Sequence, residues 1–295
     1  MDSKQKAILK TLLYADLFDY PLTKTEILRF LISEKSIGED DLYAALENKT
    51  LSIEKSEGYF YLAGRRSLVK KRQEREKISL RKLELAKKII NKISFIPMVK
   101  LIGISGALSM KNCDEDDDID LFVIMDKNSV WITRLFLVIL LTFLGVYRNR
   151  QSKNHTNKIC LNMILDKNHI SFDEKNRDLY TAHEIVQLLP VYNKEKVYER
   201  FIGENLWVKN YIPNFTIEKD VTSYKNSFSD KLIMRLIRVM QLESIAKFLQ
   251  SFYMRNHKTR EIIKDGILKF HPYDYKIYIL KDYNKGLLKY NLNTL

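Results

Sequence analysis

The sequence predicts an α+β protein in four parts, and three observations support this organisation. Three helical patterns and a hairpin pattern fill residues 1–64, and a basic connecting helix follows at 65–96. Three strand-like apolar segments and one long apolar helix occupy 97–172. Helical spacing of apolar residues then predominates in 173–295, which predicts a C-terminal helical domain. The helices and strands are distinguished by apolar periods of 3.6 and two residues.

The composition predicts a globular protein with anionic partners. The chain has 295 residues, of which 45% are hydrophobic, enough for a sizeable core in two domains. A net charge of +13 favours nucleic acid, nucleotides or an anionic membrane surface as partners, without choosing among them. Two cysteines form neither a metal-binding spacing nor a disulfide framework. Residues 1–10 lack the apolar run of a signal peptide, so we expect a cytoplasmic protein.

Residues 1–64 have the element order of a winged helix-turn-helix domain. A first helix ends before Pro21, and Thr23 and Glu26 form a capping-box pattern that begins a second. A third helix follows, and residues 51–64 predict two strands that form a hairpin. The third helix is acidic, which would repel DNA phosphates. We therefore expect a docking or regulatory role in preference to DNA recognition.

The basic connecting helix has two interpretations. Between Arg65 and Lys92 twelve lysines and arginines accompany only three glutamates, and an apolar stripe remains for packing. The charged residues either form a solvated face or hold a polyanionic substrate, including non-specific contact with nucleic acid. The sequence leaves both interpretations open.

Residues 98–105, 118–125 and 159–165 each predict a strand. The apolar segment 130–147 between them is almost long enough to cross a bilayer, but it contains Arg134. We interpret it as a helix packed between a sheet and a second layer, which makes membrane insertion unlikely.

Downstream of Asp173 we expect helices in 178–190, 197–213 and 230–256. The five histidines do not cluster at metal-binding spacing, and His183, next to Glu184, is the one that merits a test. The aromatic residues of this part indicate helix packing, although they can also line a cleft: Tyr180, Tyr192, Trp207 and Tyr211.

The acidic run at 114–120 ends inside an apolar strand. Side chains alternate along a strand, so Asp118 and Asp120 share one face, with Cα atoms roughly 6.6 Å apart. Two such carboxylates can hold one divalent cation, whereas burying them without a cation or hydrogen-bond donors is unfavourable. A helix-loop-helix calcium loop does not fit, because its glycine and glutamate positions hold Ile119 and Met125.

This stretch resembles the DNA polymerase beta-like nucleotidyltransferase superfamily. The family has a strand, a small-residue turn, about ten residues and then Asp-x-Asp on the next strand. Here "SGA" with Gly106 is followed by "DIDLFVI" with Asp118 and Asp120. The resemblance covers roughly residues 98–165 and implies a mixed sheet, Mg²⁺ or Mn²⁺ on both aspartates and an NTP as substrate. The residues that it places around the phosphates are Ser105, Gly106, Ala107, Ser109 and Lys111.

Two departures from the family pattern bear on activity. Ala107 stands where the family usually has serine after the glycine, and Asn162 aligns with the third carboxylate of many members. The resemblance implies an enzyme that transfers a nucleotidyl group to a hydroxyl on a protein, nucleic acid or small molecule. The departures keep open the alternative of a nucleotide-binding adaptor without catalysis. A winged-helix DNA-binding regulator is a further alternative, which the acidic third helix disfavours. The sequence does not identify the acceptor.

Overall fold

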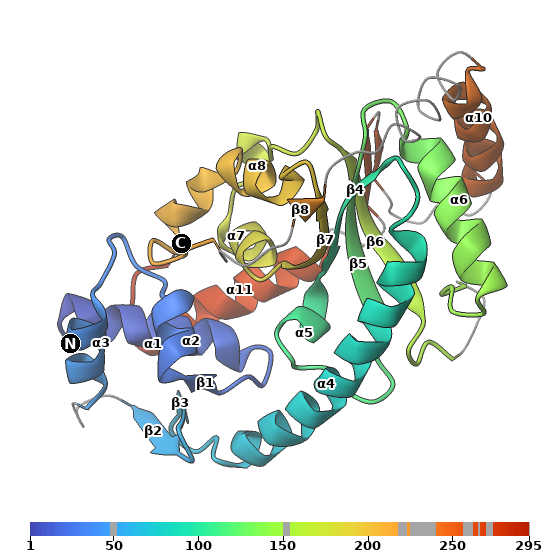
Figure 1. Cartoon of the computed structure of the whole chain (residues 1–295). Coiled ribbons are helices and arrows are strands. Elements are labelled where there is room, and N and C mark those ends of the chain that lie inside the picture. Colours follow the sequence, from blue (N-terminus) through green and yellow to red (C-terminus); the bar gives the residue numbers. More distant parts are fainter. Residues whose placement is uncertain are drawn as a thin grey trace.

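A computed structural model describes residues 1–47, 52–149, 154–217, 223–224, 240–255, 262–264, 266–269 and 274–294 (Figure 1). The molecule is a mixed α+β structure with one small and one large sheet. The N-terminal unit contains the small sheet, and a long helix leads from it to the large sheet. The predicted fold class is confirmed at this level.

The N-terminal unit has the predicted helices and hairpin, with one additional short strand. Its elements are α1 (Ser3–Asp16), β1 (Leu22–Thr23), α2 (Lys24–Arg29), α3 (Glu39–Leu46), β2 (Ile53–Ser56) and β3 (Tyr59–Leu62). The strands form an antiparallel sheet in the order β1-β3-β2. Thr23 and Glu26 form the predicted capping box at the start of α2. The hairpin turns at Glu57 and Gly58, both at positive φ, as its type requires.

The basic connecting helix is α4 (Ser67–Ile93), and its cations contact acidic groups of the protein rather than forming only a solvated face. Arg72 is 3% exposed, although it belongs to the charged pattern. Its guanidinium donates to the Tyr20 hydroxyl at 2.7 Å, to Glu26 at 3.0 Å and to the carbonyl of Lys111 at 3.0 Å. Arg72 therefore joins the N-terminal unit to the turn that follows the first strand of the large sheet.

The large sheet is mixed and has seven strands. They are β4 (Val99–Ile104), β5 (Ile119–Met125), β6 (Ile159–Asp166), β7 (Leu189–Lys194), β8 (Ser223–Tyr224), β9 (Ile262–Lys264) and β10 (Ile267–Lys269). Their order is β8-β7-β4-β5-β6-β10-β9. β5 pairs antiparallel with β4 and parallel with β6, and the remaining pairs are antiparallel except β7 with β8. The three predicted strands, β4 to β6, lie at the centre.

Residues 173–295 differ from the helical pattern that the sequence predicts, because they also supply four strands. Strand β7 occupies the end of the segment that we expected to be helical through residue 190, and β8, β9 and β10 are only two or three residues long. β7, β8 and β10 pair with strands that are remote in sequence, so local periodicity carries little information about them, and β9 is a short strand that pairs with the adjacent β10. Part of the predicted helix 230–256 lies outside the described residues, and its described part is α10 (Leu242–Arg255).

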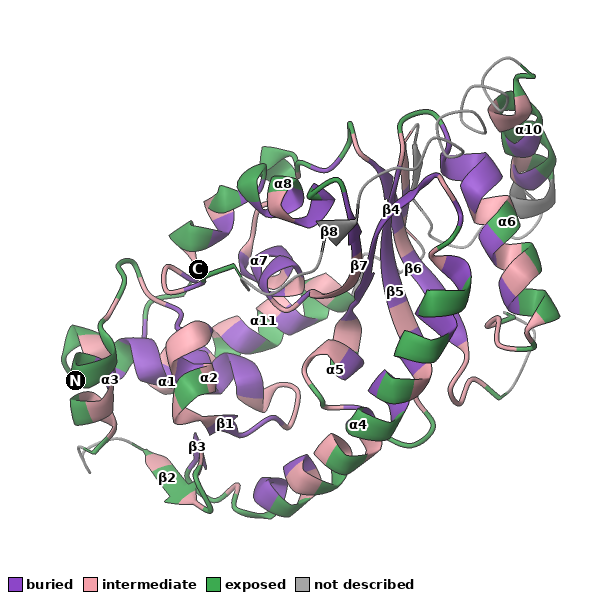
Figure 2. Cartoon of the chain, viewed as in Figure 1, coloured by how far each residue is buried: buried purple, intermediate pink, exposed green. Residues whose placement is uncertain are grey.

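Helices cover both faces of the large sheet (Figures 1 and 2). One face packs against α4, α6 (Val130–Phe143) and α10, and the other against α7 (Leu179–Val186) and α8 (Val197–Gly203). The predicted apolar helix is thus α6, with Trp131, Leu137 and Leu141 in the core of the first face. Within the described residues, no helix is long and apolar enough to span a membrane. Two 3₁₀ helices, Glu174–Asn176 and Leu206–Asn210, and the short α5 (Gly106–Ser109) complete this region.

Helix α11 (Asp274–Lys289) packs into the N-terminal unit, far from its neighbours in sequence. Tyr283 and Leu287 are buried with residues of α1, and the Tyr283 hydroxyl donates to the carbonyl of Lys10 at 3.2 Å. In Figure 1 α11 runs from the large sheet back to α1. The N-terminal unit is therefore held to the rest of the protein by both α4 and α11.

Replacing Arg72 tests the buried junction. Arg72→Ala leaves Glu26 and the Lys111 carbonyl without their buried donor, so we expect the free energy of unfolding to fall by about 3 kcal/mol. Arg81→Ala on the same helix removes an ion pair whose arginine is 70% exposed, and should change the free energy of unfolding by less than about 0.5 kcal/mol. Urea denaturation measures both. Equal losses would contradict the role of Arg72 as a buried connection.

Candidate functional site

The alternation of β5 places Asp120 on the face of the sheet covered by α7. Ile119, Leu121 and Val123 belong to the core on the α4 and α6 side, whereas Phe122 and Ile124 belong to the core on the α7 and α8 side. Strand residues two apart share a face, so Asp120 lies on the second side, as the sequence predicts. It lies at the end of β5 where apolar packing gives way to a cavity.

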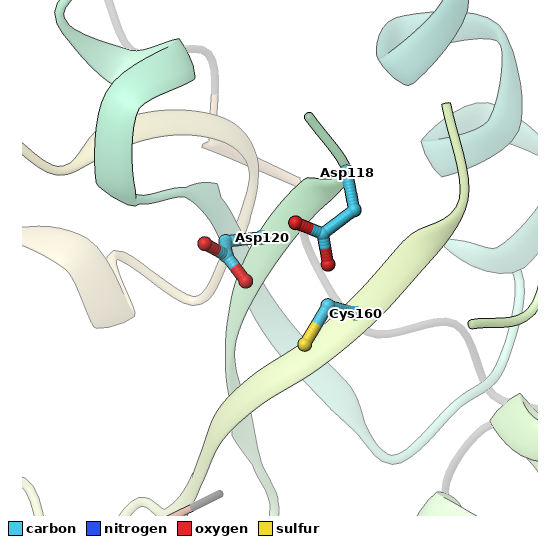
Figure 3. Close-up of side chains that lie close together, drawn as sticks. All are labelled: Asp118, Asp120 and Cys160. Atoms are coloured by element: carbon cyan, nitrogen blue, oxygen red, sulfur yellow. The ribbon is translucent and has the colours of Figure 1, made fainter. Parts of the chain in front are cut away.

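Asp118, Asp120 and Cys160 come together at this end of the sheet (Figure 3). One carboxylate oxygen of each aspartate and the cysteine sulfur all lie within 4.8 Å of one another. The parallel register pairs Asp120 with Cys160. Cys160, and not Asn162, therefore occupies the strand position directly opposite Asp120. Asn162 lies two residues further on and approaches Ser105, with 3.5 Å between its amide nitrogen and the serine hydroxyl.

The donor set suits a hard cation through its two carboxylates. Burial raises the pKa of the Cys160 thiol well above its usual range, and the charges of Asp120 and Asp118 raise it further. The sulfur is therefore a neutral thiol, a poor ligand for a cation that prefers oxygen. Asp118 and Asp120 are the residues that can hold Mg²⁺ or Mn²⁺, with the remaining positions open to water or phosphate oxygens.

Arg148 supplies the counter-charge to Asp118. Its Nη1 donates to the Asp118 carboxylate at 2.6 Å and lies 3.6 Å from the Cys160 sulfur. The backbone of Arg148 donates to the carbonyl of Ile159 at 2.9 Å, which fixes the residue beside the start of β6. Although burial lowers it, the pKa of Arg148 is raised overall by Asp118 and neighbouring groups. A guanidinium thus neutralises one of the two carboxylates that can bind a cation.

The turn after β4 lies directly against Asp120. Gly106 has φ of +66°, and a Cβ at this position would lie 2.9 Å from the Asp120 carboxylate oxygen. The amide of Ser105 donates to the carbonyl of Asp120 at 3.0 Å, which joins the turn to β5. Only glycine combines this backbone conformation with such an approach. Gly106 and Ala107 line the same cavity as Asp120, and buried Ser105 lines a smaller one next to it.

Two of the residues predicted to surround the phosphates point elsewhere. The Ser109 hydroxyl donates to the carbonyl of Gly106 at 2.8 Å, within the short helix α5. The Lys111 amine lies 3.6 Å from a carboxylate oxygen of Glu76 on α4. Neither lines the two cavities beside Asp120. The backbone of the turn reaches the site, whereas these side chains stabilise the turn and its contact with α4.

The acidic turn before β5 is neutralised by α4. Arg75 forms two hydrogen bonds with the carboxylate of Asp114, at 2.6 and 2.8 Å. Lys82, which is buried, donates to the carbonyls of Glu115 and Asp117. Together with Arg65, Lys71, Arg72 and Arg81, these two residues place six of the twelve cations of the connecting segment against groups outside the helix. They also separate the structural acidic residues from Asp118 and Asp120.

The larger cavity, of about 400 Å³, lies between the N-terminal unit and the large sheet. Its wall includes Tyr14 and Phe30 from the N-terminal unit, Gly106 and Asp120 from the sheet region, and Tyr275 from α11. A smaller cavity of about 130 Å³ adjoins it, and Tyr275 lines both. The site is thus assembled from segments spread over nearly the whole chain, which a search for local motifs does not reveal.

Helix α7 contributes Tyr180, His183 and Glu184 to the larger cavity, and Tyr180 and Glu184 to the smaller one as well. Burial lowers the pKa of His183 to about 3, so the ring is neutral. Burial, with the charge of Asp120 second, raises the pKa of Glu184 to about 7. The adjacent His-Glu pair on an apolar helix was the available sequence indication. Trp207 and Tyr211, by contrast, pack edge to face with each other outside the two cavities.

Comparisons with family models, curated proteins and solved structures find no match to this chain.

Glu184→Gln tests the electrostatics of the site. Folding raises the pKa of Glu184, so the folded protein favours its neutral form. The free energy of unfolding gained in this way is fully present below pH 4.5 and is lost as the pH rises through about 7. The variant stays neutral, so in EDTA its free energy of unfolding should exceed that of wild type increasingly with pH, by up to about 3 kcal/mol. Denaturation at several pH values measures the difference. The surface variant Glu204→Gln should show a flat difference, and a flat difference for Glu184→Gln would refute the assignment.

Proposed function

We propose that the protein transfers a nucleotidyl group from an NTP to a hydroxyl acceptor with Mg²⁺ or Mn²⁺. The observation that carries this proposal is the contact between the Gly106 turn and Asp120, with Asp118 and Asp120 on one face. A glycine turn allows phosphate to approach the backbone, and two carboxylates hold the cation that phosphates require. The two features needed to bind an NTP, a glycine turn and a cation site, are thus adjacent.

The topology around the site also supports the proposal. β4 is antiparallel to β5, the Gly106 turn follows β4, and β5 leads through α6 to the parallel strand β6. This arrangement agrees with the mixed sheet that the resemblance to polymerase beta-like nucleotidyltransferases implies. The order α1, β1, α2, α3, β2, β3 likewise agrees with a winged helix at the N-terminus.

Different residues of the chain have different roles in the proposed reaction. The cation held by Asp118 and Asp120 supplies neutralisation of the phosphates and of the leaving pyrophosphate. Lys269 and Lys276 line the smaller cavity; Lys276 is paired with Asp178, so Lys269 is the residue that provides positive charge for the triphosphate. Residues of α7 and the N-terminal unit form walls of the cavity beside Asp120 in which an acceptor can lie.

Exposed residues of α3 support a docking role for the N-terminal unit. Glu39, Asp40 and Asp41 are exposed on this helix, which occupies the recognition position of a winged helix. An acidic surface repels nucleic-acid phosphates. Any contact with nucleic acid is therefore expected through the remaining cations of α4, and is expected to be independent of sequence and weakened by salt.

A second candidate is a nucleotide-binding adaptor without catalysis. Ala107 provides no hydroxyl beside Gly106, and β6 presents Cys160 and Asn162 in place of a third carboxylate. Incubating the protein with radiolabelled NTPs, Mg²⁺ or Mn²⁺ and cell extract separates the candidates. A labelled acceptor indicates the enzyme, whereas cation-dependent NTP binding with no labelled product indicates the adaptor.

Asp120→Asn should abolish both cation-dependent NTP binding and label transfer, because it removes a charged ligand while retaining the shape of the side chain. The same variant should fold at least as stably as wild type in EDTA, since it relieves repulsion among carboxylates. Calorimetric titration of NTP with and without Mg²⁺ is the measurement. Asp116→Asn, in the exposed part of the acidic turn, is the matched control and should behave as wild type. Label transfer by Asp120→Asn at the wild-type rate would show that Asp120 has only a structural role.

Arg148→Gln should bind Mg²⁺ about tenfold more tightly than wild type, which corresponds to ~1.4 kcal/mol. The reason is that Arg148 competes with the cation for Asp118. In EDTA the variant should melt at a lower temperature, because Asp118 and Asp120 lose their counter-charge. Arg200→Gln on α8 removes an equal charge far from the site and should change neither property. A weaker response to Mg²⁺ in Arg148→Gln would contradict this competition.

A further inference from the structure

The two adjoining cavities share a wall but differ in charge. Asn162, Tyr180, Glu184 and Tyr275 line both of them. Among the described residues, the larger cavity is lined by the carboxylates of Asp120 and Glu184 and by no lysine or arginine. The smaller cavity is lined by Lys269, by Lys276, which is paired with Asp178, and by Glu184. Away from the cation held beside the Gly106 turn, a negatively charged ligand is therefore disfavoured in the larger cavity.

Most of the larger cavity's wall offers apolar surface rather than hydrogen bonds. Several polar groups in this wall already bond within the protein. The Thr11 hydroxyl donates to the carbonyl of Ala7 at 2.8 Å, and the Tyr20 hydroxyl donates to that of Met110 at 2.7 Å. Aromatic rings line the same wall, with Tyr14 stacked on His183 at 4.0 Å between centroids. Such a wall suits a compact ring or hydrocarbon body.

His183 adds one directed hydrogen-bond donor. The Gln187 amide nitrogen donates to its Nδ1 at 3.1 Å, which leaves the proton of the neutral ring on Nε2. Nε2 is buried and has no hydrogen-bond partner among the described residues, and the whole side chain is 4% exposed. Buried donors in native proteins are nearly always satisfied. A ligand acceptor atom in the cavity that His183 lines would satisfy this one.

We propose that the larger cavity binds the acceptor substrate, a small hydroxyl compound with a ring-sized apolar body and no negative charge. This inference rests on the proposed function. The acceptor hydroxyl oxygen forms a bond to the α-phosphorus of the NTP as the bond from that phosphorus to the bridging oxygen breaks. Pyrophosphate leaves with the bonding electrons, and the hydroxyl proton passes to solvent. His183 orients the acceptor, and Asp120 lines the same cavity.

Three ligands with the same hydroxyphenyl ring and different charge test the inference: tyramine, tyrosol and 4-hydroxyphenylacetate. Their binding to the full chain is measured by calorimetry. The cation and the neutral alcohol should bind at least tenfold more tightly than the anion. His183→Phe keeps the ring and removes the donor, so it should weaken tyrosol binding about tenfold. Tyr275→Ala should weaken all three probes. Tyr278→Ala, on the same helix but outside both cavities, should leave them unchanged.

Several results would overturn the inference. One is equal or tighter binding of the anion, and another is binding that neither His183→Phe nor Tyr275→Ala weakens. Tyr275 is 52% exposed, so the second variant remains informative if the first fails to fold. Displacement of tyramine by adenosine would assign the cavity to the nucleobase instead. NTP titration on the same samples separates the two proposals. If the probes bind in the expected order but NTP does not bind, only the proposed nucleotidyltransferase function is refuted. If NTP binds but the probes do not follow the expected order, only the acceptor cavity is refuted.

Discussion

Carboxylates gathered at one end of β5 repel one another, and much of the surrounding structure compensates for that repulsion. Arg148 pairs with Asp118, and α4 neutralises the preceding acidic turn through Arg75 and Lys82. Because these contacts hold α4 against the turn, they also fix the helix from which Arg72 reaches the N-terminal unit. The electrostatics of the site and the position of the N-terminal unit thus have a common cause.

The N-terminal unit forms part of the site rather than an appendage to it. Tyr14 and Phe30 complete the cavity whose opposite wall contains Asp120 and Glu184. The contacts of α4 and α11 with this unit set the width of the cavity. Whatever ligand the cavity holds, its fit depends on residues remote from the carboxylates.

Local patterns predicted the elements that depend on local physics. The capping box at Thr23, the hairpin turn at Gly58 and the alternation of side chains around Asp120 could all be predicted from the sequence, because each follows from backbone geometry or side-chain period. Strands β7, β8 and β10 were not predicted, since they pair with strands remote in sequence, and neither was the three-residue β9 beside β10. Register had the same limit: one strand alone does not show that Cys160 pairs with Asp120 while Asn162 lies two residues further along β6. Buried Arg72 likewise looks like any other cation in a basic helix.

The contact between α11 and α1 also bears on how the chain acquires its structure during synthesis. The Tyr283 hydroxyl and the Lys10 carbonyl are 273 residues apart in sequence. Helix α1 leaves the ribosome long before α11 and therefore exposes part of its apolar surface until α11 emerges, because Tyr283 and Leu287 cover it only then. Domains usually fold as they emerge, and exposed apolar surface invites aggregation in the interval. This protein is consequently expected to finish folding only after translation has passed α11, with α1 as the segment most in need of protection by chaperones.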